Sequence, residues 1–194
     1  MLSQMRTFTT QLLVPVTSTV GIRGGVEEPP YDAEPLAGAV QIRRYGRRIA
    51  AQITVHGDEE DARGEGFRSL AAYIFGGNRQ GDRIAMTAPV GQQGSHDRGW
   101  VVRFFMPAGS TLEALPVPED ARVELVQIPA ETVAVLRFSG DRGADSIARR
   151  TADLRDTLRD YGFTAIGDPS AWFYDPPWTL PCRRRNEIAI PVET

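Results

Sequence analysis

The chain has 194 residues, of which 41% are hydrophobic and 24% charged, a composition typical of one soluble globular domain. Its net charge of −3 argues against a basic nucleic-acid-binding surface over the whole domain. All 22 basic residues are arginine, which excludes Schiff-base and phosphate-loop lysines, and the lone Cys182 excludes an internal disulfide and a cysteine-based zinc site.

Residues 1–25 contain apolar positions at roughly helical spacing, interrupted by threonines and Pro15. These interruptions argue against a membrane span and against a secretory signal. We therefore predict an amphipathic N-terminal arm that packs on the domain, on a protein partner or on a membrane surface. One folded domain, residues 26–194, is predicted to follow it, and we expect a cytoplasmic protein that associates with membranes if the arm binds lipid.

The folded domain contains an internal repeat with an offset of 83 residues. Each copy is predicted to start with two strands, at about 39–45 and 48–56 in the first and at about 122–128 and 132–139 in the second. The offset places apolar residues on apolar residues and ends on a shared Gly-Asp, with Val40 on Val123, Ile42 on Leu125, Ala51 on Ala134, Ile53 on Leu136, Val55 on Phe138, Gly57 on Gly140 and Asp58 on Asp141.

A helix is predicted after each Gly-Asp pair. In the first helix Asp58 is the expected N-cap, three acidic residues follow it, and Gly76 ends the helix. The apolar stripe of the second helix is Ile147, Thr151, Leu154, Leu158 and Tyr161. Alternating aspartates and arginines cover its opposite face, which indicates solvated ion pairs more than a metal site.

Each helix is followed by an extended, proline-containing segment and a final strand. In the first copy these are IAMTAPV at 84–90 and WVVRFFMP at 100–107; in the second they are WFYDPP at 172–177 and NEIAIP at 186–191. The predicted fold is α+β: a pseudo-twofold pair of β-α-β-β repeats, about 39–108 and 122–192, forming a distorted antiparallel β-barrel flanked by two α-helices.

Six short motifs occur in a fixed order over roughly residues 27–192: EEPPY at 27–31, IRRYG at 42–46, GFRSLAAYIFGGN at 66–78, IAMTAPV at 84–90, FYDPPWTLP at 173–181 and RRNE at 184–187. In this order and spacing they resemble the SOUL/haem-binding protein family, and the chain looks like a bacterial member. The resemblance implies the two-repeat distorted barrel. It also implies non-catalytic binding of haem or another tetrapyrrole in an apolar cleft beside the first helix.

Such a cleft needs an apolar slot for the ring and basic groups at its mouth. We expect Arg63 at the mouth, one wall from the first helix and an opposite wall from the aromatic segment: Phe67, Leu70, Ala71 and Ile74 facing Tyr174, Trp178 and Leu180. The alternative is that the helix residues simply cover the sheet and the aromatic residues fill one end of the core. Arg44 stands where an animal family member has a histidine proposed as an iron ligand, so His56 is the remaining candidate metal ligand.

The sequence shows no catalytic triad and no nucleotide-binding fingerprint, so no nucleotide cofactor is expected. Two alternatives to tetrapyrrole binding stay open. One is a hydrolase-like enzyme acting on a small hydrophobic ligand in the same cleft, with Glu187 or Glu65 as acid/base. For Glu187 an ion pair with Arg184 or Arg185 is the competing role. The other alternative is an interaction protein that docks through residues 1–25.

Overall fold

The computed structural model describes residues 22–23 and 26–193. Two short strands, β1 (Ile22–Arg23) and β2 (Val26–Glu27), pair with each other. The rest of the arm predicted for residues 1–25 lies outside the described residues, so its amphipathic character stays a prediction.

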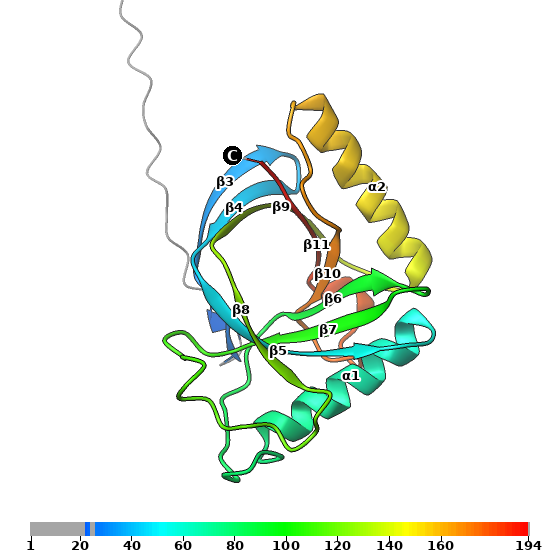
Figure 1. The fold of residues 1–194 in the computed structure, drawn as a ribbon. Helices are drawn as coiled ribbons and strands as arrows, with labels where there is room; N and C mark the ends of the chain where they lie inside the picture. The colour runs from blue at the N-terminus through cyan, green and yellow to red at the C-terminus, as the bar shows by residue number, and fades with distance from the viewer. Residues whose placement is uncertain (1–21, 24–25, 194) are drawn as a thin grey trace, which may run out of the picture.

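Nine strands form one antiparallel sheet, and two helices, α1 (Glu59–Ile74) and α2 (Ala144–Asp160), lie on its outer surface (Figure 1). The order across the sheet is β3-β4-β9-β11-β10-β6-β7-β5-β8. The strand bounds are β3 (Tyr31–Ala37), β4 (Val40–Tyr45), β5 (Arg48–Val55), β6 (Val90–Ser95), β7 (Gly99–Phe105), β8 (Glu124–Ile128), β9 (Glu131–Phe138), β10 (Ser170–Phe173) and β11 (Asn186–Pro191).

The two repeats interlock instead of folding side by side. Strand β4 of the first repeat pairs with β9 of the second, and β5 pairs with β8, so that Ile42 lies opposite Ala134 and Ala51 opposite Leu125. Two-residue connections at 46–47 and 129–130 carry the chain from one half of the sheet to the other, which curls the sheet (Figure 1). The predicted α+β distorted barrel with two flanking helices is confirmed. Each repeat has the order β-β-α-β-β, since it opens on two strands.

Helix α1 covers the outer face of β5 and β7. Its residues Leu70, Tyr73 and Ile74 are at most 1% exposed. A Cβ atom at Gly66 would lie 2.6 Å from Val102 Cγ2, so glycine at this position lets the helix approach the sheet closely. Asp58 occupies the predicted N-cap position, although its side chain makes no capping hydrogen bond.

Helix α2 covers the outer face of β9, β10 and β11 through Leu154 and Leu158, which are at most 2% exposed. Tyr161, predicted to belong to the same stripe, is 54% exposed because it is the C-cap residue beyond the last helical turn. The polar face carries the predicted ion pairs, including Arg150 with Asp153 at 3.3 Å. Among the described residues, no helix is long and apolar enough to cross a membrane.

The inner face of the curled sheet forms a separate interior. Because successive side chains of a strand point to opposite faces, the neighbours of the residues beneath α2 point inward. The buried inner residues are Tyr45, Val133, Val135, Trp172 and Ala189. Tyr31 and Tyr174 pack against them.

Candidate functional site

The α1 residues predicted as one wall of the cleft occupy different environments. Leu70 and Ile74 pack fully against the sheet, and half-buried Ala71 joins the same apolar cluster. Phe67 is 40% exposed, with its ring centroid 5.3 Å from that of Phe104. Leu70 and Ile74 thus cover the sheet, as the alternative interpretation held, and Phe67 is the wall residue with a large exposed apolar surface.

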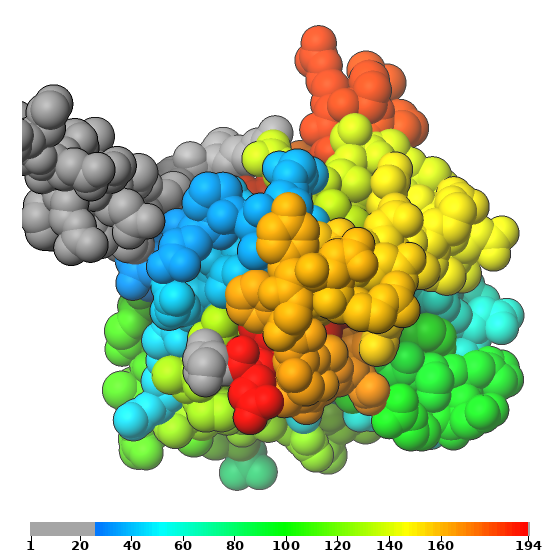
Figure 2. All heavy atoms as spheres, turned by 90° about the horizontal axis from the view of Figure 1, so that it is seen from above, coloured from blue at the N-terminus to red at the C-terminus, as the bar shows by residue number. Residues whose placement is uncertain are grey.

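The predicted opposite wall also divides. Tyr174 packs with the inner cluster, whereas Trp178 is 83% and Leu180 61% exposed. The segment that follows β10 projects from the rest of the molecule in Figure 2, where it is red-orange. Arg184 fixes its shape, because its Nε donates to Thr179 O and its Nη2 to Pro177 O, both at 2.8 Å.

Basic groups gather where β10, α1 and the start of α2 meet. The guanidinium carbon of Arg63, on α1, lies 4.6 Å from the centroid of the Phe173 ring, and that of Arg142, just before α2, lies 5.8 Å from the same centroid. Figure 1 shows the two helices beginning close to each other. Burial and then repulsion from Arg63 and Arg184 lower the pKa of the Arg142 guanidinium. Three arginines therefore share this region; we call Arg63, Arg142 and Arg184 the arginine cluster.

The arginine cluster has few acceptors around it. Arg63 is 8% exposed; its Nη1 donates to Gln92 Oε1 at 3.3 Å, and its nearest carboxylate, exposed Glu60, is 3.8 Å away. Asn186 lies directly opposite Phe173 on the neighbouring strand, so both side chains share the outer face. The buried Nδ2 of Asn186 has no partner among the described residues. This region is thus rich in donors and suited to an anionic group.

Glu187 lies in the inner interior and is 0% exposed. Arg43 donates to both of its oxygens, from Nη1 at 2.8 Å and Nη2 at 3.0 Å. Arg185 Nε donates at 2.9 Å and the Tyr174 hydroxyl at 2.7 Å. Arg185 in turn donates to both oxygens of buried Glu28, at 2.8 and 2.9 Å. We call these five residues the inner ionic network.

The electrostatics of the inner ionic network keep Glu187 ionised. Burial alone raises the pKa of its carboxyl, but the Arg43 hydrogen bonds and the charges of Arg43 and Arg185 outweigh burial, and the pKa lies below its usual value. Burial raises the pKa of the Tyr174 hydroxyl well above its usual value, so this group stays a donor. A carboxylate held this way is a structural acceptor, not a poised acid. The predicted alternative, an ion pair with Arg185, is the role that Glu187 has.

The remaining predicted site residues are Glu65 and His56. Glu65 forms a surface ion pair with Arg122 at 2.8 Å. His56 is exposed at the end of β5. Among the described residues, no group of three or more His, Cys, Asp or Glu side chains could hold a metal ion.

Three of the cavities that the described residues form lie in different parts of the sheet. One, of about 450 Å³, lies by the start of β5; another, of about 950 Å³, lies between β3, β4 and residues 182–185; the third, of about 50 Å³, lies on the inner face. None of these three is lined by an α1 residue.

Sequence reasoning did not identify Arg142, nor Arg43 and Glu28 of the inner ionic network. The sequence contains a weak signal for Arg142. The 83-residue offset places it on Glu59, so the second helix has a positive charge near its start where the first helix has a negative one. Glu28 and Arg43 lie within the EEPPY and IRRYG motifs. Glu28 is 157 positions from its partner Arg185, and Arg43 is 144 positions from its partner Glu187. Nothing local to either motif indicates that contact.

Comparison with known proteins gives relatives of similar length. Human heme-binding protein 2 is 28% identical over 169 residues, which cover 82% of this chain and 80% of the relative. Mouse heme-binding protein 1 is 30% identical over 173 residues, 85% of each chain.

Two solved structures share the fold at low identity. One is EcmrR in a DNA complex, with a TM-score of 0.61 at 15% identity, covering 80% of this chain and 57% of that one. The other is a hydrolase from Listeria innocua, with a TM-score of 0.58 at 13% identity, covering 79% of this chain and 91% of that one. At such identities the similarity concerns the fold alone.

The family model described as SOUL heme-binding protein matches residues 26–191. Together with the two heme-binding relatives, this match shows that the chain belongs to the SOUL haem-binding family.

Proposed function

We propose that the protein binds haem or another tetrapyrrole without catalysing a reaction, on the face between α1 and the segment that follows β10. Relatives named as heme-binding proteins support the ligand class. The observation that carries the location is the arginine cluster around Phe173, which lies where the two proposed walls meet. The net charge of −3 argues against nucleic acid as the ligand, so we expect a small molecule. We also expect the protein to act in the cytoplasm.

The chemistry of the face suits the two parts of a tetrapyrrole. Exposed Phe67, Trp178 and Leu180 offer apolar and aromatic surface for the flat ring. Arg63, Arg142 and Arg184 offer donors for its carboxylates. Burial, and then repulsion from Arg63 and Arg184, lowers the pKa of Arg142, so a bound carboxylate relieves an existing repulsion.

Iron ligation is a separate matter. His56, the predicted iron ligand, is exposed at the end of β5 and is not one of the residues of the arginine cluster. The residues present therefore fit the ring and its carboxylates better than they fit the metal. Binding through apolar contact and carboxylates predicts that metal-free protoporphyrin binds about as well as hemin.

Titration with hemin and with metal-free protoporphyrin, followed by the Soret band and by porphyrin fluorescence, tests the proposal. We expect saturable binding of both ligands and a loss of affinity of about fivefold or more in Trp178→Ala, because the ring loses an aromatic contact. Tyr161→Ala, which removes another exposed aromatic residue on the far end of α2, is the matched control and should bind normally. No saturable change at micromolar protein, or equal losses in both variants, would refute the proposal.

The hydrolase-like alternative loses its support. It needs a carboxylate near the ligand with a raised pKa, whereas the pKa of Glu187 is lowered and its oxygens are occupied by Arg43, Arg185 and Tyr174. Glu65 is paired with Arg122 at the surface. Neither group is arranged as an acid or base beside the proposed face.

A further inference from the structure

The cavity of about 950 Å³ lies on the inner face of the curled sheet, where residues 182–185 lead into β11. Six of the strand residues that line it share one face of the sheet: Tyr31, Ala33 and Pro35 of β3, Gln41 and Arg43 of β4, and Arg137 of β9. Arg137 lies directly opposite Glu187, which belongs to the inner ionic network. Residues directly opposite each other in an antiparallel pair project to the same side of the sheet. The Arg137 side chain therefore points to the inner face, on which the cavity lies.

The lining of this cavity is strongly basic. Five of its lining residues are arginines, whereas Glu28 is the one acidic residue that lines it in the described part of the chain. The whole chain carries a net charge of −3, so this concentration of positive charge is local. A hollow lined by one sign of charge concentrates ligands of the opposite sign.

The two buried arginines of the lining are neutralised within the protein. Arg43 pairs with Glu187, and Arg185 pairs with Glu187 and with Glu28. Both Glu28 oxygens accept from Arg185 Nη1. Two positive and two negative charges cancel here, so the floor of the cavity is neutral.

The other three arginines of the lining lack such partners. Arg137 lies opposite Glu187, but the Glu187 oxygens already accept four hydrogen bonds, about as many as a carboxylate holds. Exposed Arg137 and Arg183 form no salt bridge with any residue that the structure describes. Arg184 donates to two backbone carbonyl oxygens, which carry no full charge. Three positive charges thus remain without a carboxylate around the mouth of the cavity.

The walls of the cavity add donors to these charges. Gln41 Oε1 accepts from Nε and Nη2 of Arg43, both at 3.2 Å, which leaves the amide N–H groups of Gln41 as donors on the same face. Guanidinium groups match the oxygens of phosphates and carboxylates in geometry as well as in charge. The chemistry of the cavity therefore favours a ligand with several negatively charged oxygens.

We propose that this cavity binds a small polyanion, whose phosphate or carboxylate oxygens are held by Arg137 and Arg183 with Arg184 beside them. The cavity and the tetrapyrrole face lie on opposite sides of the sheet. Arg137 points to the inner face, whereas Arg63 and Arg142 lie against the outer face. Arg184, between the two, is the residue that they share.

Calorimetric titration with pyrophosphate and with citrate tests the proposal, because these probes carry several negative charges on phosphate and on carboxylate oxygens. Acetate is the singly charged control. We expect saturable binding of at least one probe, about tenfold or more tighter than that of acetate, since several charge-assisted contacts form instead of one. Failure of both probes to saturate at millimolar concentration would overturn the proposal, and so would an equal affinity for acetate.

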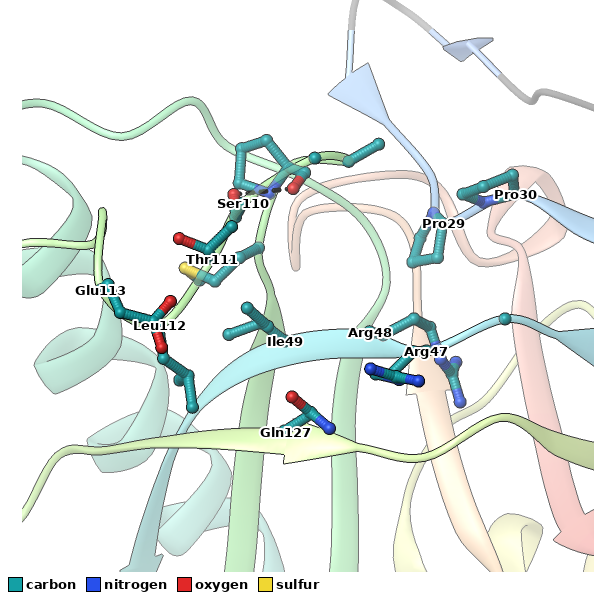
Figure 3. A pocket seen from close by; sticks show the side chains of 15 residues that line it. Pro29, Pro30, Arg47, Arg48, Ile49, Ser110, Thr111, Leu112, Glu113 and Gln127 are labelled. Atoms are coloured by element: carbon teal, nitrogen blue, oxygen red, sulfur yellow. Dashed lines mark hydrogen bonds between the residues drawn. The ribbon is translucent and has the colours of Figure 1, made fainter.

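Charge-reversal variants locate the site. Arg137→Glu and Arg183→Glu should each weaken binding of the probe about tenfold or more, since a repulsion replaces an attraction. Arg47→Glu is the matched control: it makes the same charge change at an exposed arginine beside the other large cavity, near Ile49 (Figure 3), and should leave binding unchanged. If Arg47→Glu loses as much affinity as the other two variants, net charge explains the binding and the proposal is wrong.

Folding and hemin binding are measured in the same variants, by circular dichroism and by the Soret band. Arg183 precedes β11 and lies outside the sheet, so Arg183→Glu still decides the matter if Arg137→Glu, opposite buried Glu187, does not fold. Unchanged probe binding in folded Arg183→Glu would refute the proposal. Folded Arg137→Glu should bind hemin as the natural chain does. Parallel losses of hemin and probe binding in that variant would mean one shared site and would refute a separate polyanion cavity.

Discussion

The outer and inner faces of the curled sheet use alternate residues of the same strands, yet they are stabilised by different interactions. On β11, Ile188 and Ile190 face outward into the apolar cluster beneath α2, whereas Glu187 faces inward to two arginines. Apolar packing is the sum of many small contacts. A buried ion pair depends on both partners, since removing one leaves an uncompensated charge. The inner face should therefore be more sensitive to a single substitution than the outer face.

The largest expected effect is that of Glu187→Gln, which leaves Arg43 and Arg185 buried without their shared carboxylate. We expect the free energy of unfolding to fall by about 3–5 kcal/mol, measured by urea denaturation. Glu34→Gln removes a carboxylate from an exposed pair with Arg44 and should change stability little. A loss below about 1 kcal/mol for Glu187→Gln would show that the inner arginines are solvated in solution.

On the outer face, Leu154→Ala removes a fully buried side chain from the cluster beneath α2. We expect a loss of about 3 kcal/mol in the same urea assay, from lost burial and the cavity left behind. Tyr161→Ala, at the exposed end of the same helix, should have little effect. Equal losses for both variants would mean that α2 is not anchored through Leu154.

A smaller effect should follow from acidification. The folded pKa of Glu187 lies below its usual 4.5, so its stabilising contribution is present above that value and is lost as the pH falls through the folded pKa. Urea denaturation between about pH 6 and pH 3 should show a decline in stability that is shallower in Glu187→Gln, which has no proton to bind there. Parallel curves for the two proteins would contradict this assignment.

The smallest effect is expected for an ion pair on the outer helix surface. Arg150→Ala removes the half-exposed partner of Asp153 and should cost at most about 0.5 kcal/mol in thermal or urea unfolding. A loss as large as that of Glu187→Gln would mean that surface pairs contribute as much as the inner ionic network.

Much of the fold could be predicted from the sequence because its signals are local. The 83-residue offset, the Gly-Asp helix starts and the apolar periods of the strands identified both helices and the distorted barrel. The candidate site was harder to predict. A helical stripe looks the same whether it covers a sheet or lines a cleft, so the burial of Leu70 and Ile74 could not be separated from the exposure of Phe67. Likewise, Trp172 and Trp178 are the same residue type in one aromatic segment, but Trp172 is 5% exposed and Trp178 is 83% exposed.

The sequence by itself determined the two helices, the two strands that open each repeat, the internal repeat and the family, because these depend on periodicity and on motifs within short stretches of chain. It did not identify β3 (Tyr31–Ala37) or β6 (Val90–Ser95) as strands. The tertiary structure decided which strands of the two repeats pair. The paired residues are 86 to 96 positions apart for β4 with β9 and 72 to 80 positions apart for β5 with β8. It also decided the role of the polar residues. Glu187, Arg43 and Glu28 become one buried network, and Arg63 and Arg142 meet at Phe173, because the curled sheet brings distant segments into contact.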